Sequence, residues 1–135
     1  KIGVDEYPYC IAEVGINHNG DIDKALEMIT VAKEAGAEAV KFQTFRAKEM
    51  CGNPNQQFTY QSQGETITEP MVEMFHRNEL KRDNWFTIKN ECIKHDIVFM
   101  STPQNFSDLK LLLEIGVPAI KIGSDDFTNV GLSSQ

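Results

Sequence analysis

Two lysines interrupt stretches that otherwise have the composition of buried strands. Lys41 lies in AVKFQTF (residues 39–45), and Lys121 lies in AIKIGSDDF (residues 119–127). Burying an ammonium group without a partner is costly, so such a lysine either loses its proton or meets an anion. Each lysine follows a glycine by the same spacing, in EAGAEAVKF and EIGVPAIKI. This repeat predicts that the two side chains lie at equivalent depths and face the same way.

Polar side chains also stand where each apolar run ends: Glu13, Gln43, Thr102 and Ser124. The carboxyl ends of parallel strands form the edge where α/β proteins bind ligands. Two lysines with a threonine and a serine are suited to a phosphate or a carboxylate. The alternative is that each lysine pairs with a structural carboxylate such as Glu13 or Asp126. Glu13 itself is either a group that orients a substrate or moves a proton, or the counter-ion of the lysines.

The loop INHNG (residues 16–20) adds two further candidates, Asn17 and His18, which either line the site or form a turn. Adjacent Asp125 and Asp126 are weak evidence for a metal site. We therefore predict no metal ligands in this chain.

The pattern of apolar residues and breakers predicts alternating strands and helices. Asp21 is the expected N-cap of the first helix, and Ser107 that of the last. Between the second strand and the next full helix lies a long polar segment, which we interpret as a substrate lid. The expected strands are 9–15, 37–45, 97–103 and 117–124, and the expected helices are 22–36, 71–80, 84–94 and 107–116.

This βαβαβαβ order predicts an α/β fold with parallel strands in the order 1-2-3-4 and helices on one face. A whole (β/α)8 TIM barrel needs about 250 residues, so the 135 residues are expected to form its first four β/α units. A half-barrel leaves two strand edges and inward residues (Ile11, Val98 and Met100) open. We therefore expect self-association.

Composition excludes some classes of protein. A formal net charge of −7 argues against a nucleic-acid binder, and no apolar run approaches the length of a membrane helix. The cysteines (Cys10, Cys51 and Cys92) are odd in number and far apart, which favours reduced thiols and a cytoplasmic protein.

Four motifs in order, IAEVGINHNG, AGAEAVKFQTF, STP and IKIGSDDFTN, resemble the sialic acid synthase family over about residues 9–129. The resemblance implies a (β/α)8 barrel followed by an antifreeze-like domain, in a domain-swapped homodimer. Residues 1–135 would be the N-terminal half of the barrel, without the second half and the antifreeze-like domain. Such enzymes condense phosphoenolpyruvate with an N-acetylated mannosamine-type sugar and release phosphate. A divalent metal, manganese or magnesium, assists, with its histidine ligands in the second half of the barrel.

The resemblance also implies roles for single residues. Lys41 and Lys121 would hold the phosphate and carboxylate of phosphoenolpyruvate, and Thr102 and Ser124 would add hydroxyl hydrogen bonds. Glu13 would lie beside the reacting carbons, with Gln43 facing the sugar. Asp126 takes the place of an acidic residue in the family, although many members read SGE or SGD where this chain reads SDD.

Two other functions remain open at this stage. Lysines on barrel strands also form imines, so a Schiff-base aldolase is one alternative. The other is a non-catalytic half-barrel that binds anions. If the chain is a synthase of the resembled family, either as a fragment or as a truncated gene product, it is expected to be inactive alone.

Overall fold

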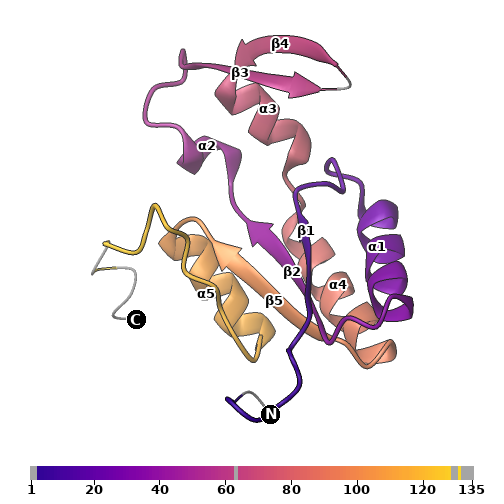
Figure 1. The fold of residues 1–135 in the computed structure, drawn as a ribbon. Coiled ribbons are helices and arrows are strands. Elements are labelled where there is room, and N and C mark those ends of the chain that lie inside the picture. Colours follow the sequence, from indigo (N-terminus) through magenta and orange to yellow (C-terminus); the bar gives the residue numbers. More distant parts are fainter. Residues whose placement is uncertain (1–2, 63, 129–130, 132–135) are drawn as a thin grey trace.

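The computed structural model describes residues 3–62, 64–128 and 131; Asn129, where the family resemblance ends, lies outside them. A parallel sheet carries helices on one face, and a small hairpin with one helix stands beyond the carboxyl ends of its strands (Figure 1). The elements are β1 (Ile11–Gly15), α1 (Ile22–Glu34), β2 (Ala39–Thr44), α2 (Ala47–Met50), β3 (Gln57–Ser62), β4 (Glu65–Pro70), α3 (Met71–Asn78), α4 (Arg82–Lys94), β5 (Val98–Pro103) and α5 (Phe106–Ile115).

The sheet has the order β1-β2-β5, and both of its strand pairs are parallel. Its register sets Glu13 beside Lys41, and Gln43 beside Thr102. The predicted α/β class, parallel pairing and sequential order of these strands are confirmed. Strands joined by helices on one face are the repeating unit of a (β/α)8 barrel.

The fourth predicted strand (residues 117–124) is not a strand in this structure. It contributes one parallel bridge, Ser101 with Ile120, next to β5. The segment thus occupies the predicted fourth place, but it lies at the edge of the sheet with a neighbour on one side. A ladder needs several consecutive pairs, and here a turn already begins at Ser124.

The polar segment after β2 is more ordered than the sequence predicted. It holds the short helix α2 and an antiparallel hairpin of β3 and β4, as well as the expected helix α3. Asp21 caps α1 as predicted, with its carboxylate accepting from the amides of Asp23 and Lys24. The predicted cap Ser107 is wrong: Asn105 is the N-cap of α5, and the Ser107 hydroxyl donates to Glu49 at 2.7 Å.

The core lies between the sheet and helices α1, α4 and α5. Phe42 and Phe99, from adjacent strands, pack edge to face with ring centroids 5.8 Å apart, and Trp85 of α4 packs against both. Because side chains alternate along a strand, Phe42 facing the helices directs Lys41 and Gln43 to the opposite face. No helix in the described part of the chain is long and apolar enough to span a membrane.

Candidate functional site

A pocket of about 560 Å³, here called the lysine pocket, lies at the carboxyl ends of the strands. It brings together seven of the residues predicted from sequence: Glu13, Asn17, Lys41, Gln43, Thr102, Lys121 and Ser124. They come from β1 and the loop after it, from β2 and β5, and from the segment after α5, so the parallel topology is what gathers them. Its other lining residues include Asp125, considered from the sequence only as a weak metal ligand, and six residues that the sequence did not indicate: Gly15, Ile16, Met50, Phe75, Gln104 and Gly123.

Lys41 and Glu13 form an ion pair in this pocket. The Lys41 side chain is 15% exposed and that of Glu13 is 49% exposed, so the lysine lies deeper than its partner. The carboxylate that the sequence analysis offered as a structural counter-ion is therefore in contact with Lys41. An arriving anion must share or replace that carboxylate.

Lys121 is exposed, unlike Lys41, so the prediction of equivalent depths is wrong. Its backbone amide donates to the carbonyl of Ser101 at 3.1 Å, which fixes the segment against β5. No carboxylate within the described ranges forms an ion pair with Lys121. Among the described residues, Lys121 thus differs from Lys41, whose ammonium group is already paired with a carboxylate. Thr102, nearly buried on β5, and exposed Ser124 offer hydroxyls to the same pocket.

Gly15 ends β1 with a bulge that shapes the pocket. The register shifts between Glu13 and Gly15, and Gly15 has φ +55°. A Cβ atom there would stand 3.3 Å from the Glu13 carboxylate and 4.0 Å from the Gln43 amide nitrogen. Glycine thus permits the left-handed backbone at this position, and its lack of a side chain lets Glu13 and Gln43 lie close to the Gly15 backbone.

Two predicted site residues lie elsewhere. His18 is buried, with its ring against Phe42 on the helix side of the sheet. Its Nδ1 accepts the Gly20 amide at 3.0 Å, and burial lowers the pKa of the imidazole. His18 thus belongs to the turn, the alternative already raised. Asp126 does not line the lysine pocket; the adjacent Asp125 does.

A second pocket of about 640 Å³, here called the aromatic pocket, adjoins the first. The two share Ile16, Asn17, Gln43 and Phe75. The hairpin and α3 supply most of the remaining lining: Phe58, Tyr60, Ser62, Met74, Arg77 and Asn78, with Asn19 from the loop after β1. This lining is aromatic and rich in amide groups.

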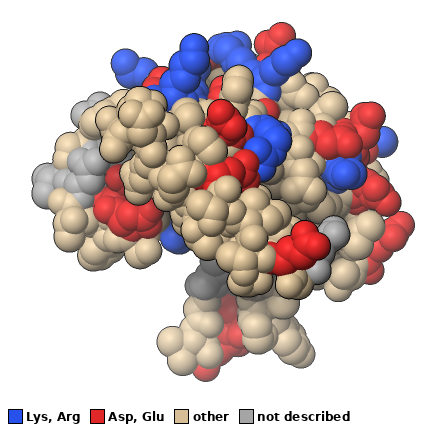
Figure 2. Space-filling model, turned by 90° about the horizontal axis from the view of Figure 1, so that it is seen from above, with Lys and Arg blue, Asp and Glu red and all other residues tan. Residues whose placement is uncertain are grey.

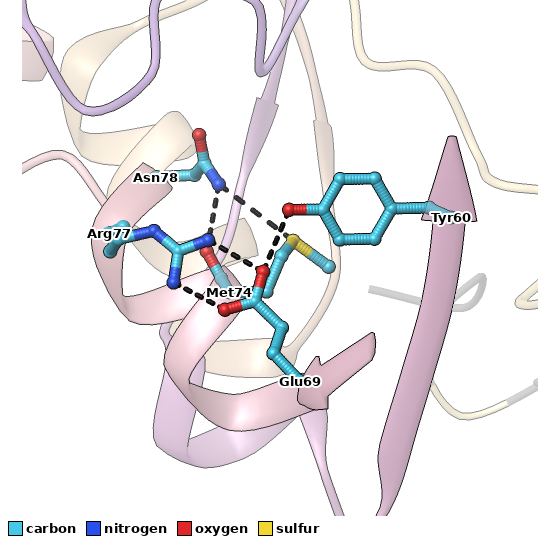
Figure 3. A network of polar contacts seen from close by, with 5 residues as sticks. All are labelled: Tyr60, Glu69, Met74, Arg77 and Asn78. Atoms are coloured by element: carbon cyan, nitrogen blue, oxygen red, sulfur yellow. Dashed lines mark hydrogen bonds and ion pairs between the residues drawn. The ribbon is translucent and has the colours of Figure 1, made fainter. Parts of the chain in front are cut away.

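A polar network ties the hairpin to α3 at the aromatic pocket (Figure 3). Both terminal nitrogens of Arg77 donate to Glu69, and the Tyr60 hydroxyl donates to the same carboxylate at 2.7 Å. These hydrogen bonds, that of Arg77 first, lower the pKa of Glu69 to about 2, and the bond to Glu69 raises the pKa of Tyr60. The hairpin and α3 are thereby held together as one lobe.

The described residues contain no group of three or more histidine, cysteine, aspartate or glutamate side chains arranged to hold a metal ion. The donor set that a divalent metal needs is thus not found in the described part of this chain.

Seen from above, a row of lysine and arginine side chains lies along one margin, and acidic side chains are spread over the rest of that face (Figure 2).

Comparison with protein families matches residues 28–134 to the NeuB family. The N,N'-diacetyllegionaminic acid synthase of Legionella pneumophila is 36% identical over 122 residues, which are 90% of this chain and 34% of that protein. The N-acetylneuraminate-9-phosphate synthase of Mus musculus is 32% identical over 124 residues, or 90% of this chain and 33% of that protein. The chain thus spans about a third of the length of these relatives.

Among solved structures, an N-acetylneuraminic acid synthetase from Leptospira borgpetersenii, in complex with citrate, superposes with a TM-score of 0.80. It is 32% identical, and the match covers 94% of this chain and 40% of that one. The likeness therefore extends over the sheet, its helices and most of the rest of the described chain.

Proposed function

The chain belongs to the NeuB family, and we propose that it supplies the phosphoenolpyruvate site of a nonulosonic acid synthase. The reaction condenses phosphoenolpyruvate with an N-acetylated mannosamine-type sugar and releases phosphate. The relatives above are named as synthases of such acids.

The observation that carries the proposal is the convergence of Lys41 and Lys121 on one pocket. Phosphoenolpyruvate bears a phosphate and a carboxylate, and two ammonium groups with neighbouring hydroxyls match that charge. The complex of the Leptospira synthetase with citrate, another carboxylate, is consistent with an anion-binding family. The charge of the substrate would offset the cost of desolvating the mostly buried Lys41, while exposed Lys121 adds a second positive charge.

The chemistry requires a carbon–carbon bond followed by loss of phosphate. The enol carbon adds to the sugar aldehyde, whose oxygen takes a proton. Water then attacks the resulting oxocarbenium-like carbon, and phosphate leaves with cleavage of its bond to that carbon. Glu13 lines the lysine pocket beside Lys41, and we propose that its carboxylate moves a proton or stabilises the positive carbon.

The aromatic pocket is our proposed place for the sugar. It adjoins the lysine pocket and shares Gln43 with it, so a ligand there lies next to bound phosphoenolpyruvate. Amide side chains provide donors and acceptors for hydroxyl and acetamido groups. The described residues supply no set of metal donors, so none of these steps is assigned to a metal held by them. We further propose, from family membership, that the protein acts in the cytoplasm as a homo-oligomer and that manganese or magnesium is bound outside this chain.

The test is anion binding by the 135-residue chain, measured calorimetrically with inorganic phosphate and with phosphoenolpyruvate. Charge-assisted contacts contribute roughly 1.5–3 kcal/mol each. Lys41→Ala and Lys121→Ala should therefore each weaken binding by about one to two orders of magnitude. Lys110→Ala, on the exposed side of α5, is the matched control and should change nothing.

Equal affinity in all four proteins would refute the proposed site. Borohydride trapping of a carbonyl substrate on Lys41 or Lys121 would favour the Schiff-base aldolase instead.

A further inference from the structure

Arg77 is the one cation among the described residues that line the aromatic pocket. It lies on α3, close to the carboxyl end of that helix. The other lining side chains are amides, aromatics, an isoleucine, a methionine and a serine, all uncharged. Whether the aromatic pocket attracts an anion therefore depends on whether the Arg77 guanidinium is available.

The Arg77 guanidinium already forms two hydrogen bonds with the carboxylate of Glu69, which lies on β4. Its two terminal nitrogens donate to the two carboxylate oxygens at 2.5 and 2.7 Å, the two-pronged geometry that makes arginine–carboxylate pairs strong (Figure 3). The Tyr60 hydroxyl donates to the same carboxylate and further stabilises its charge. With a pKa of about 2, lowered first by Arg77, Glu69 stays ionised at neutral pH. Arginine and glutamate together contribute no net charge to the aromatic pocket.

We propose that Glu69, by occupying Arg77, makes this chain select an uncharged N-acetylated sugar over the phosphorylated form of the same sugar. This inference rests on the proposed function, since it names the class of acceptor that the aromatic pocket takes. Of the two relatives described above, one is named for a phosphorylated product and the other for an unphosphorylated one.

A phosphate group in the aromatic pocket would have to displace Glu69 from Arg77 or accept its negative charge as a neighbour. Displacement leaves a carboxylate beside a dianion, which is unfavourable at short range. A neutral sugar needs no such exchange. The amides of Asn17, Asn19 and Asn78 provide neutral hydrogen bonds, and the stacked rings of Phe58 and Tyr60, 5.8 Å apart, offer an apolar surface.

The experiment compares N-acetylmannosamine with its 6-phosphate, followed through the amide NMR signals of the β3–β4 hairpin. Saturating inorganic phosphate is present throughout, so that the lysine pocket is filled. The wild-type chain should bind the neutral sugar at least as tightly as the phosphorylated one. Glu69→Gln, which frees Arg77, should improve binding of the phosphorylated sugar by about tenfold and leave the neutral sugar within about twofold. Glu65→Gln, with the same charge change on the same strand, should leave both affinities unchanged.

Three results would overturn the inference. The first is a higher affinity of the wild-type chain for the phosphorylated sugar than for the neutral one. This measurement does not depend on the folding of any variant. The second is a Glu69→Gln chain with an unchanged ratio of affinities. The third is no response of the hairpin to either sugar. The proposed function fails separately, if phosphate binding does not depend on Lys41 and Lys121.

Discussion

Glu13 and Lys41 stand side by side in the register of two parallel strands, and their side chains form an ion pair in the lysine pocket. From the sequence alone, a counter-ion role and a catalytic role for Glu13 were alternatives. The geometry allows both in succession, because an anion that binds Lys41 releases the Glu13 carboxylate from the ion pair. The pair keeps the deeper lysine in contact with a charge before the substrate arrives.

Glu13→Gln should therefore separate binding from turnover. The amide removes a negative charge and a competitor from the anion site, so we expect the phosphate affinity of the chain to rise by about two- to tenfold. In a full-length enzyme with the same change, turnover should fall, whereas the affinity for phosphoenolpyruvate should not. Calorimetry and steady-state kinetics measure the two effects. Glu34→Gln, at the exposed end of α1, is the control, and a loss of phosphate affinity in Glu13→Gln would contradict the assignment.

Gly20→Ala should be strongly destabilising, because Gly20 packs closely against the backbone at the carboxyl end of α3. Its φ is +74°, and an added Cβ would collide with the backbone carbonyl of Arg77. We expect a loss of about 2–4 kcal/mol, measured by urea unfolding. Gly36→Ala isolates the backbone cost, since Gly36 has φ +86° with open space around it, and it should lose about 1 kcal/mol. Equal losses of unfolding free energy in the two variants would mean that α3 shifts to make room for the added methyl group at little cost.

The strand ends were predictable because their signals are local. An apolar run that turns polar at its end needs only the parallel topology to place that polar residue at the ligand edge, as the lysine pocket shows for Glu13 and Gln43. The sequential order of β1, β2 and β5 follows similarly from short helical connections.

The hairpin was missed because its strands are largely exposed. Phe58 and Tyr60 alternate with polar residues before Gly64, a weak strand–turn pattern that was available in the sequence. His18 shows a different difficulty. Its neighbour in space is Phe42, which lies far along the chain, so no local pattern distinguishes a buried imidazole from one that lines a site.

Asp108 should make stability depend on pH in an unusual direction. Burial raises its pKa from 3.8 to about 6, against the hydrogen bond from Asn105. The folded state therefore binds more protons than the unfolded state between these two pKa values. The free energy of unfolding should fall as pH rises through this window and stay lower above it.

The isosteric Asp108→Asn lacks this titration, so its stability relative to wild type should grow across the window, by at most roughly 3 kcal/mol. Urea unfolding at a series of pH values measures the difference. Asp125→Asn, at an exposed position, is the control for the loss of one carboxylate. A constant difference between Asp108→Asn and wild type would show that Asp108 titrates normally in the folded protein.

The 135-residue chain should self-associate through the outer side of β1. β1 is an edge strand of the described sheet, and a groove of about 560 Å³ runs between it and α1, lined by Ala12, Val14, Met28, Val31 and Ala32 among others. Ile11 is 43% and Val31 55% exposed beside this edge. An open edge with apolar neighbours pairs readily with another chain, so we expect a dimer or larger assembly at micromolar concentration by light scattering.

Val31→Glu should shift the assembly toward monomer, whereas Leu113→Glu, equally exposed on α5 and far from the groove, should not. A wild-type chain that stays monomeric at that concentration would show that the edge is protected by its own twist and charges.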